Sequence, residues 1–363
     1  MPAPVVWHPD YAVPLRPGHP FPMSKYGYLR AALDRRGLMP RGGWLAPAPL
    51  APPQIAAAHD FAYVERVCAG TLRPDEIRRI GLPASPAVAR RSLLACAGSL
   101  LAGRLALERG VALNAAGGSH HAGPGHGAGF CVFNDVAVAA RLLLAEGRVS
   151  RVLVVDCDVH QGDGTALIFQ EDSRVTTLSV HAERNFPVRK ARSDLDVGLP
   201  DGTGDAAYLA ALDGALSTVL GSGRPASGWR AADEQPASVG RAAAEHLGGC
   251  LRAADEHHRG GFRATDEHLA SICEETAETG AEGRERPPFG LVFYNAGVDV
   301  TEGDRLGRLA LSAAGLRARE GLVLGRVRAA GLPVAVVMGG GYSTDPEELA
   351  ARHAEVFAAA AEV

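Results

Sequence analysis

The sequence predicts an α/β fold in which a central, mostly parallel sheet is covered by helices on both faces. Short β-rich runs alternate along the chain with longer helical patterns, which is the order typical of a parallel sheet with crossover helices. The chain has 363 residues, and 47% of them are hydrophobic, which is enough for a large buried core. In such sheets ligands bind at the carboxyl ends of the strands, so polar residues at those ends are the candidates for function.

Each element of this prediction rests on a local pattern. One helix begins at Ser85-Pro86, with an N-cap serine and a proline in the first turn, and ends at Gly110. Asn134 can cap the helical run DVAVAARLLLAEG, and Ser312 can cap the run AAGLRAREGLVLGRVRAAG. The predicted strands are Val111–Ala115, Val152–Val155, Val175–Val180, Leu291–Tyr294 and Pro333–Met338.

One segment interrupts the alternation. Residues 221–288 are rich in Gly, Ala, Glu, Arg and His, and they contain the related pieces RAADE, RAADE and RATDE. We interpret this segment as a low-complexity insertion, either disordered or a short helical hairpin, within a single catalytic domain that spans residues 1–363. The main fold is expected to resume at Phe289.

Composition excludes several classes of protein. The net charge of -4 gives no basic footprint for nucleic acid or anionic membranes. No apolar run approaches the ~20 residues of a membrane helix, and the proline-rich N-terminus does not resemble a signal peptide. Six cysteines without a CxxC pair are typical of a reduced environment. We therefore expect a cytoplasmic protein that binds neither nucleic acid nor membrane.

The segment RVLVVDCDVHQGDGT places three carboxylates and an imidazole at the end of a predicted strand. Such groups are costly there unless something compensates their charge. On an extended strand, side chains two residues apart share one side, which would bring Asp156, Asp158 and His160 together. Asp158 and His160 can then reach one cation, while Asp156 lies deeper. The structural alternative is an Asp- and Gly-rich turn that binds nothing.

A second strand end supplies a third ligand. The run LVFYNAGVDV ends with Asp299, after a turn at Ala296-Gly297. Asp158, His160 and Asp299 would form an open O/N/O set, which is the arrangement of catalytic zinc. Fe(II) suits the same donors.

Two further strand ends present groups suited to acid–base and electrophilic catalysis. His120 and His121 follow paired glycines in NAAGGSHHAG, where Asp156 and Asp163 could each accept an imidazole N–H. An adjacent histidine pair is otherwise often a surface accident. In VAVVMGGGYS, three glycines present Tyr342, whose phenol could donate to a developing oxyanion. The alternative for Tyr342 is a buried tyrosine in a tight turn.

Together these segments resemble the zinc-dependent histone deacetylase family. The resemblance lies in GGSHHAGPGHGAGFCVFND, VLVVDCDVHQGDGT, YNAGVD with EGDRLGRLALS, and VMGGGYS. HPFPMSKYGYL and RSDLDVGLPDGTGD bring the chain nearest to the class IV-like and bacterial branch. The likeness runs from about Pro4 to Leu220 and from Phe289 to the C-terminus. It implies an arginase/deacetylase-type three-layer α/β fold.

The resemblance also implies roles for individual residues. His121 would be the general base and then the acid, with Asp163 behind it. His120, paired with Asp156, would be its electrostatic partner, and Tyr342 would polarise the acyl carbonyl.

The same resemblance implies two metal sites and a substrate tunnel. Zinc would be bound by Asp158, His160 and Asp299. A structural potassium ion would be held by Asp156, Asp158, His160, Ser179 and Val180. The substrate would be bound by the Gly129 carbonyl and by tunnel walls at Phe130 and Phe186.

Two positions of this chain can be compared with that branch, and one departs from it while the other agrees. The class IV-like branch often has Asn where this chain has Asp163, whereas Gln161 is the residue expected there. We expect both positions to tune the pH dependence rather than the chemistry.

The predicted function is hydrolysis of the amide bond of N-acyl-lysine by metal-activated water, as a protein deacetylase or a defatty-acylase. Acetylated polyamines or other small amides are alternative substrates. A ureohydrolase with two manganese ions would need a DxHxD pattern, but the chain has DxDxH. A non-catalytic acyl-lysine binder tolerates loss of a catalytic histidine or of the tyrosine, yet all are present here.

Overall fold

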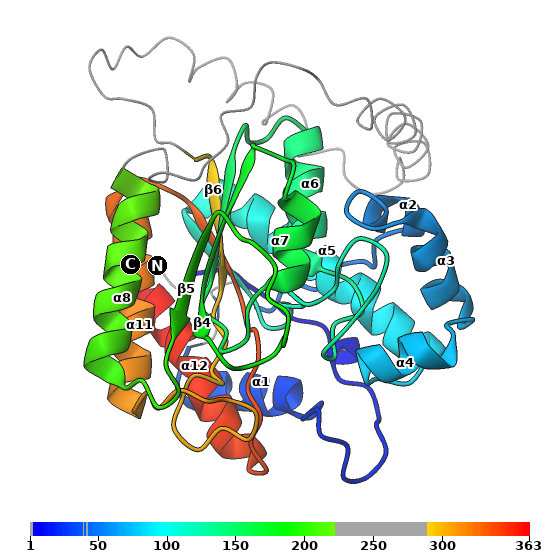
Figure 1. The fold of residues 1–363 in the computed structure, drawn as a ribbon, viewed down its shortest axis with the longest axis horizontal. Coiled ribbons are helices and arrows are strands. Elements are labelled where there is room, and N and C mark those ends of the chain that lie inside the picture. The colour runs from blue at the N-terminus through cyan, green and yellow to red at the C-terminus, as the bar shows by residue number, and fades with distance from the viewer. Residues whose placement is uncertain (1–2, 39, 41–42, 222–288) are drawn as a thin grey trace. The chain divides into compact units, whose positions relative to one another are not determined.

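A seven-stranded parallel sheet forms the middle layer of the protein (Figure 1). The computed structural model describes residues 3–38, 40, 43–221 and 289–363. The strand order is β1-β2-β7-β6-β3-β4-β5, and every neighbouring pair is parallel. The strands are β1 (Val5–Val6), β2 (Val111–Asn114), β3 (Val152–Asp156), β4 (Val175–Ala182), β5 (Leu195–Leu199), β6 (Leu291–Asn295) and β7 (Val334–Val337).

Helices cover both faces of the sheet, as predicted (Figure 1). On one face α5 packs against α6, and α6 packs against α7. On the other face α11 packs against both α8 and α12, and α12 packs against α1. The bounds are α1 (Lys25–Arg35), α2 (Pro52–Ile55), α3 (Phe61–Ala69), α4 (Pro74–Ile80), α5 (Pro86–Arg109), α6 (Asp135–Ala145), α7 (Asp163–Phe169), α8 (Asp205–Gly221), α11 (Ala313–Ala329) and α12 (Pro346–Glu362), with a short 3-10 helix η1 (Pro9–Tyr11).

The three predicted helix starts are confirmed by their caps. The side chain of Ser85 accepts a hydrogen bond from the Val88 N–H (3.3 Å) and so caps α5. The side chain of Asn134 caps α6 at Ala137 (3.0 Å), and that of Ser312 caps α11 at Gly315 (3.0 Å). These bonds satisfy N–H groups that have no partner within the helix.

The five predicted strands are also confirmed, as β2, β3, β4, β6 and β7. The two edge strands, β1 and β5, were not predicted. β1 has only two residues, too few to show a period. β5 is half exposed, and its sequence LDVGL includes Asp196 and Gly198, which are rare in strands. Both strands are identified only by their pairing, β1 with β2 and β5 with β4.

The register brings the carboxyl ends of the inner strands to one level. Asp156, the last residue of β3, pairs with Ser179 of β4 and with Asn295, the last residue of β6. Asn295 also pairs with Val337, and Val337 pairs with Asn114 of β2. The loops that follow β2, β3, β6 and β7 therefore leave from the same edge, where ligands bind in sheets of this type.

All of the described helices and strands belong to one compact unit. Of the predicted insertion at 221–288, only Gly221 is described, as the last residue of α8; the rest of that prediction lies outside the described residues. Among the described residues, no helix combines the length and the apolar character needed to cross a membrane.

Candidate active site

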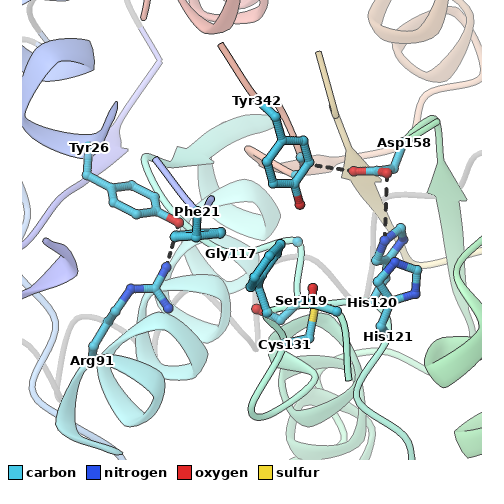
Figure 2. A pocket seen from close by; sticks show the side chains of 15 residues that line it. Phe21, Tyr26, Arg91, Gly117, Ser119, His120, His121, Cys131, Asp158 and Tyr342 are labelled. Carbon is cyan, nitrogen blue, oxygen red and sulfur yellow. Dashed lines mark hydrogen bonds and ion pairs between the residues drawn. The ribbon is translucent and has the colours of Figure 1, made fainter. Parts of the chain in front are cut away.

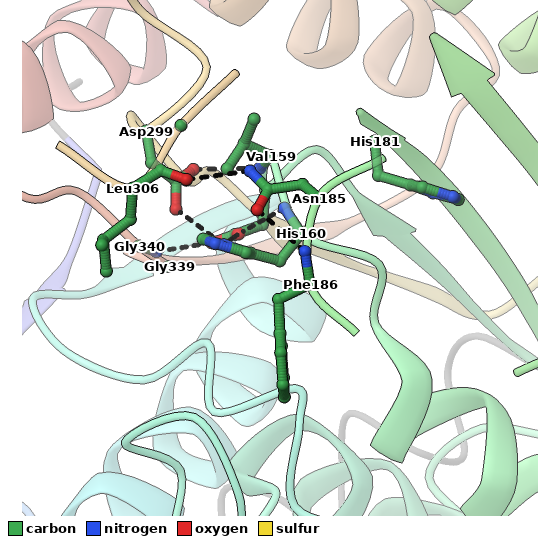
Figure 3. A network of polar contacts seen from close by, with 12 residues as sticks. Val159, His160, His181, Asn185, Phe186, Asp299, Leu306, Gly339 and Gly340 are labelled. Carbon is green, nitrogen blue, oxygen red and sulfur yellow. Dashed lines mark hydrogen bonds and ion pairs between the residues drawn. The ribbon is translucent and has the colours of Figure 1, made fainter. Parts of the chain in front are cut away.

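Three side chains at the strand ends form a compact group of candidate metal ligands. One ligand atom from each of Asp158, His160 and Asp299 lies within 4.8 Å of those of the other two, and all three residues are buried. Nδ1 of His160 lies 2.9 Å from Asp158 Oδ1 and 3.3 Å from Asp299 Oδ2, so this nitrogen faces both carboxylates (Figure 3). The three residues predicted from two separate motifs are thus brought together.

The chemistry of this group fits a divalent cation. Asp299 Oδ2 is buried and has no hydrogen-bond partner among the described residues. Burial, with the charge of Asp158 nearby, raises the pKa of Asp299 to about 7. Burial disfavours a charged His160, but the nearby carboxylates of Asp158 and Asp299 outweigh this and raise the pKa of His160 to about 10. Two mutually repelling carboxylates that draw positive charge between them form a site for a cation.

Glycines allow the two carboxylates to approach the loops on either side. A Cβ atom on Gly297 would lie 2.6 Å from Asp158 Oδ2, and one on Gly340 would collide with Asp299 Oδ2. The Gly340 N–H instead donates to Asp158 Oδ2 (2.7 Å). No larger residue fits at either position without displacing a carboxylate.

The two adjacent histidines each contact a carboxylate. His120 Nδ1 lies 2.6 Å from Asp156 Oδ2, and His121 Nδ1 lies 2.6 Å from Asp163 Oδ1. The ring centroids of His120 and His121 are 4.1 Å apart, and both rings line the same pocket as Asp158 (Figure 2). Because Nδ1 of each ring faces a carboxylate, Nε2 is left for other partners.

The surroundings separate the two histidines electrostatically. Burial opposes charge on His120, but the carboxylates of Asp156 and Asp158 outweigh it and raise the pKa of His120 to about 9. Burial and the charge of His120 lower the pKa of His121 to about 4, although Asp163 opposes the change. At neutral pH His120 is therefore cationic and His121 is neutral. A pair with separated pKa values is typical of a charge-stabilising group beside a general base.

Tyr342 stands across the pocket from the histidines, with its hydroxyl directed into it (Figure 2). Its N–H donates to Asp304 Oδ2 (2.7 Å), and its ring centroid lies 6.2 Å from that of His160. Burial and the charges of Asp158 and Asp299 raise the pKa of Tyr342 well above its usual value. The phenol therefore stays protonated and is available as a donor.

Of the predicted substrate-contacting residues, Gly129 and Phe130 line the same pocket, and Phe186 packs against His121, which also lines it. Gly129 and Phe130 both have positive φ angles (53° and 67°), and the Phe130 ring lies 6.0 Å from that of Tyr342. Phe186 packs edge-on against His121 at 4.8 Å and is 42% exposed. A Cβ on Gly129 would lie 3.4 Å from the Phe186 ring, so Phe186 lies beside Gly129.

Of the five residues predicted to hold potassium, Asp158 and His160 belong to the candidate metal group, and Asp156, Ser179 and Val180 lie in β3 and β4. Asp156 Oδ1 accepts hydrogen bonds from the Asp158 N–H (3.1 Å) and from Asn295 Nδ2 (2.9 Å). Ser179 Oγ lies 3.0 Å from His181 Nδ1, and Val180 is buried in β4 beside it. The potassium site stays a prediction.

The prediction that Asp158 and His160 share one side of a strand is wrong. β3 ends at Asp156, so neither residue lies in a strand. The chain instead makes two successive side-chain-to-backbone turns, in which Asp156 accepts from the Asp158 N–H and Asp158 accepts from the His160 N–H (3.0 Å). These turns direct Asp158 and His160 to one point.

Sequence reasoning missed the residues that hold the loops in place. Asp135, fully buried at the start of α6, accepts from the Ser119 N–H (2.7 Å) and the Gly118 N–H (3.2 Å), which fixes the loop before His120. The buried Lys25 donates from Nζ to the Gly339 carbonyl (3.1 Å). Both residues lie in segments that the motifs contain, but only the fold brings them to the loops.

Comparison with solved structures defines the class of fold. The crystal structure of the HDA15 HD domain superposes with a TM-score of 0.66 at 18% identity, and the match covers 100% of this chain and 89% of that one. The fold is therefore the arginase/deacetylase-type α/β fold. Within it, the chain belongs to the histone deacetylase family, because the family model of the histone deacetylase domain matches residues 19–227 and 262–360. The protein is a hydrolase that acts on amide bonds.

The chain is also similar in sequence to the following three proteins. An uncharacterized protein of Picosynechococcus sp. is 40% identical over 366 residues, covering 99% of each chain. Histone deacetylase 2 of Arabidopsis thaliana is 26% identical over 333 residues, covering 89% of this chain and 70% of that one. The acetoin utilization protein AcuC of Staphylococcus aureus is 34% identical over 158 residues, 39% of this chain and 40% of that one.

Proposed function

We propose that the protein is a zinc-dependent hydrolase that removes acyl groups from the side chains of lysine residues in proteins or peptides. The observation that carries the proposal is a neutral, carboxylate-backed His121 in the same pocket as Asp158 and Tyr342. A base, a candidate metal ligand and a hydroxyl donor around one pocket are the parts that amide hydrolysis by water requires.

In this proposal Asp158, His160 and Asp299 hold zinc, which, when bound, activates water and polarises the acyl carbonyl. Fe(II) suits the same ligands. Potassium is assigned to Asp156, Ser179 and Val180, with Asp158 and His160 shared between the two sites.

His121 moves the protons. Its low pKa keeps Nε2 unprotonated at neutral pH, so it can take a proton from the attacking water. The hydrogen bond from Nδ1 to Asp163 holds the ring in the tautomer that this step needs. His121 then returns a proton to the leaving lysine amine.

His120 and Tyr342 stabilise developing negative charge from fixed positions. The cationic His120, held against Asp156, offsets negative charge that develops in the pocket. The protonated Tyr342 donates to the oxygen of the tetrahedral species, and the Gly129 carbonyl accepts from the substrate amide. Phe130 and Phe186 pack along the lysine methylenes.

The direct test is hydrolysis of one lysine peptide that carries an acetyl, an octanoyl or a myristoyl group. We expect turnover that a zinc chelator abolishes and that added zinc restores. The preferred chain length distinguishes a deacetylase from a defatty-acylase. Zinc-loaded protein that hydrolyses none of the three peptides would contradict the proposed substrate class.

Exposed apolar side chains near His121 favour a peptide over a polyamine. Phe186 packs against His121, Val188 (96% exposed) follows two residues later, and Leu306 (40% exposed) is joined to this loop because Asn185 Nδ2 donates to its carbonyl (2.9 Å). An apolar surface on the protein can pack against the apolar side chains of a peptide. The ammonium groups of a polyamine instead need acidic partners. We expect acetyl-lysine peptides to have a higher kcat/KM than acetylated polyamines, and the reverse order would support the small-amide alternative.

The role of Asp163 predicts a shift in pH dependence. Asp163 raises the pKa of His121 against the effects of burial and of His120, so Asp163→Asn lowers that pKa further. The neutral imidazole is the base, and the loss of activity on acidification therefore moves to lower pH. A weaker base also lowers kcat/KM at pH 7, by about 10²-fold.

The measurement is kcat/KM against pH for wild type and Asp163→Asn, with the exposed Asp34→Asn on α1 as the matched control. An acid limb that moves to higher pH, or a profile that matches the control, would show that Asp163 does not act through His121.

A further inference from the structure

Behind the candidate metal ligands lies a buried ion pair that the mechanism above does not use. Arg319 and Glu320 are consecutive residues of α11, and the side chains of both are 0% exposed. Arg319 Nη2 donates to Glu320 Oε1, and Glu320 Oε2 accepts from the Tyr294 hydroxyl (2.6 Å). A desolvated pair of this kind is weak evidence for stability by itself, so its contacts need another explanation.

The other end of the guanidinium joins two loops. Arg319 Nη1 donates to the Cys157 carbonyl (3.1 Å) and to the Gly297 carbonyl (2.6 Å). Cys157 immediately precedes Asp158, and Gly297 lies two residues before Asp299. One nitrogen therefore contacts both loops that contribute carboxylates to the candidate metal group.

Backbone pairing of β3 with β6 ends at these loops, and beyond it they are joined by the bond from the Val159 N–H to Asp299 Oδ1 (2.9 Å) and by Arg319. Past the ends of β3 and β6, the Cys157 N–H still donates to the Asn295 carbonyl (3.0 Å). Further along these two loops, the carbonyls of Cys157 and Gly297 accept hydrogen bonds from Arg319. Beyond them the carboxylates of Asp158 and Asp299 repel each other, which favours separation of the loops when no cation lies between them.

We propose that Arg319 is a positioning residue that sets the spacing of the Asp158 and Asp299 loops and thereby the affinity of the metal site. The proposal rests on the proposed metal site. Glu320 and Tyr294 hold the guanidinium in the plane from which Nη1 reaches both carbonyls. Groups that orient metal ligands from outside typically change metal affinity by about 10–100-fold when they are removed.

The test is the double variant Arg319→Met/Glu320→Leu, which removes both buried charges together and leaves neither unpaired. The zinc Kd is measured by competition with a chromogenic chelator, and thermal unfolding is measured on the metal-free protein. The visible spectrum of the Co(II)-substituted protein reports the geometry of the ligands. Arg317→Met is the matched control, because Arg317 lies on the same helix with its side chain 65% exposed.

We expect the double variant to bind zinc about 10–100-fold more weakly and to change the cobalt spectrum, while Arg317→Met matches wild type. A merely structural pair would alter thermal unfolding of the metal-free protein and leave the zinc Kd of the folded protein unchanged, which would overturn the proposal. If the double variant does not fold, the zinc Kd of Arg319→Lys is the deciding measurement. The single ammonium of lysine lacks the planar, forked guanidinium that bonds two carbonyls and a carboxylate at once. A wild-type zinc affinity in Arg319→Lys would likewise overturn the proposal.

The same titration separates this proposal from the proposed function. Wild-type protein that binds no zinc contradicts the metal site itself. Wild-type and double-variant proteins that bind zinc equally well contradict only the role of Arg319.

Discussion

Tyr342→Phe is expected to reduce kcat by about 10²–10³-fold while leaving the zinc content unchanged. The tyrosine hydroxyl points into the pocket, and burial with the charges of Asp158 and Asp299 keeps it protonated. It is therefore a donor placed in advance for the oxygen on which negative charge develops. Phenylalanine keeps the ring packing against Phe130 and the backbone bond to Asp304, so the loop should not move.

The measurement is steady-state hydrolysis of the preferred acyl-lysine peptide, with zinc determined on the same sample. Tyr28→Phe is the matched control, since Tyr28 lies on α1 and is 37% exposed. A loss confined to KM would assign Tyr342 to substrate binding, and full activity would remove it from the mechanism.

Asp299→Asn is expected to abolish zinc binding at stoichiometric zinc and to lower activity by on the order of 10³-fold or more. The amide retains an oxygen that can accept the 2.9 Å bond from the Val159 N–H. It removes the negative charge that faces His160 and Asp158. Without that charge, the remaining ligands are one carboxylate and one imidazole.

The same substitution should stabilise the metal-free protein. The pKa of Asp299 is raised from 3.8 to about 7 on folding, so above pH 7 the folded protein contains a charged carboxylate that burial and Asp158 disfavour. As the pH falls from about 7 to about 4, folded wild type takes up the proton and recovers this stability. The gain in melting temperature from Asp299→Asn is therefore largest above pH 7 and shrinks toward pH 4.

Thermal unfolding at several pH values, with and without zinc, checks both effects. Asp213→Asn is the matched control, because Asp213 is an exposed carboxylate that pairs with Arg326 on the surface. A metal-free Asp299→Asn protein that is less stable than wild type above pH 7 would contradict the electrostatic account of this site.

Local patterns were sufficient for most elements of the fold. Caps at Ser85, Asn134 and Ser312 mark helix starts because the missing hydrogen bonds of a first helical turn must be supplied by nearby side chains. The inner strands were predictable because both of their faces are buried. The edge strand β5 was not, since its exposed positions accept polar residues.

The candidate site, like the fold, depends partly on local sequence and partly on the tertiary structure. The sequence by itself determined which residues are candidates for the chemistry, because Asp158, His160, His121, Asp299 and Tyr342 each stand in a motif at the end of a predicted strand. It also determined the class of fold, because alternation of buried strands and helices permits few architectures.

Only the tertiary structure decided how those residues act. Parallel register brings the ends of β3 and β6 to one level, so that Asp158 and Asp299 meet. Burial and the different carboxylates around each ring then give His120 and His121, which are neighbours in the chain, different charge states. Arg319 reaches both ligand loops from a helix whose sequence shows no motif. Distances between groups remote in sequence, and the removal of water around them, set these properties, and neither is encoded in any short segment.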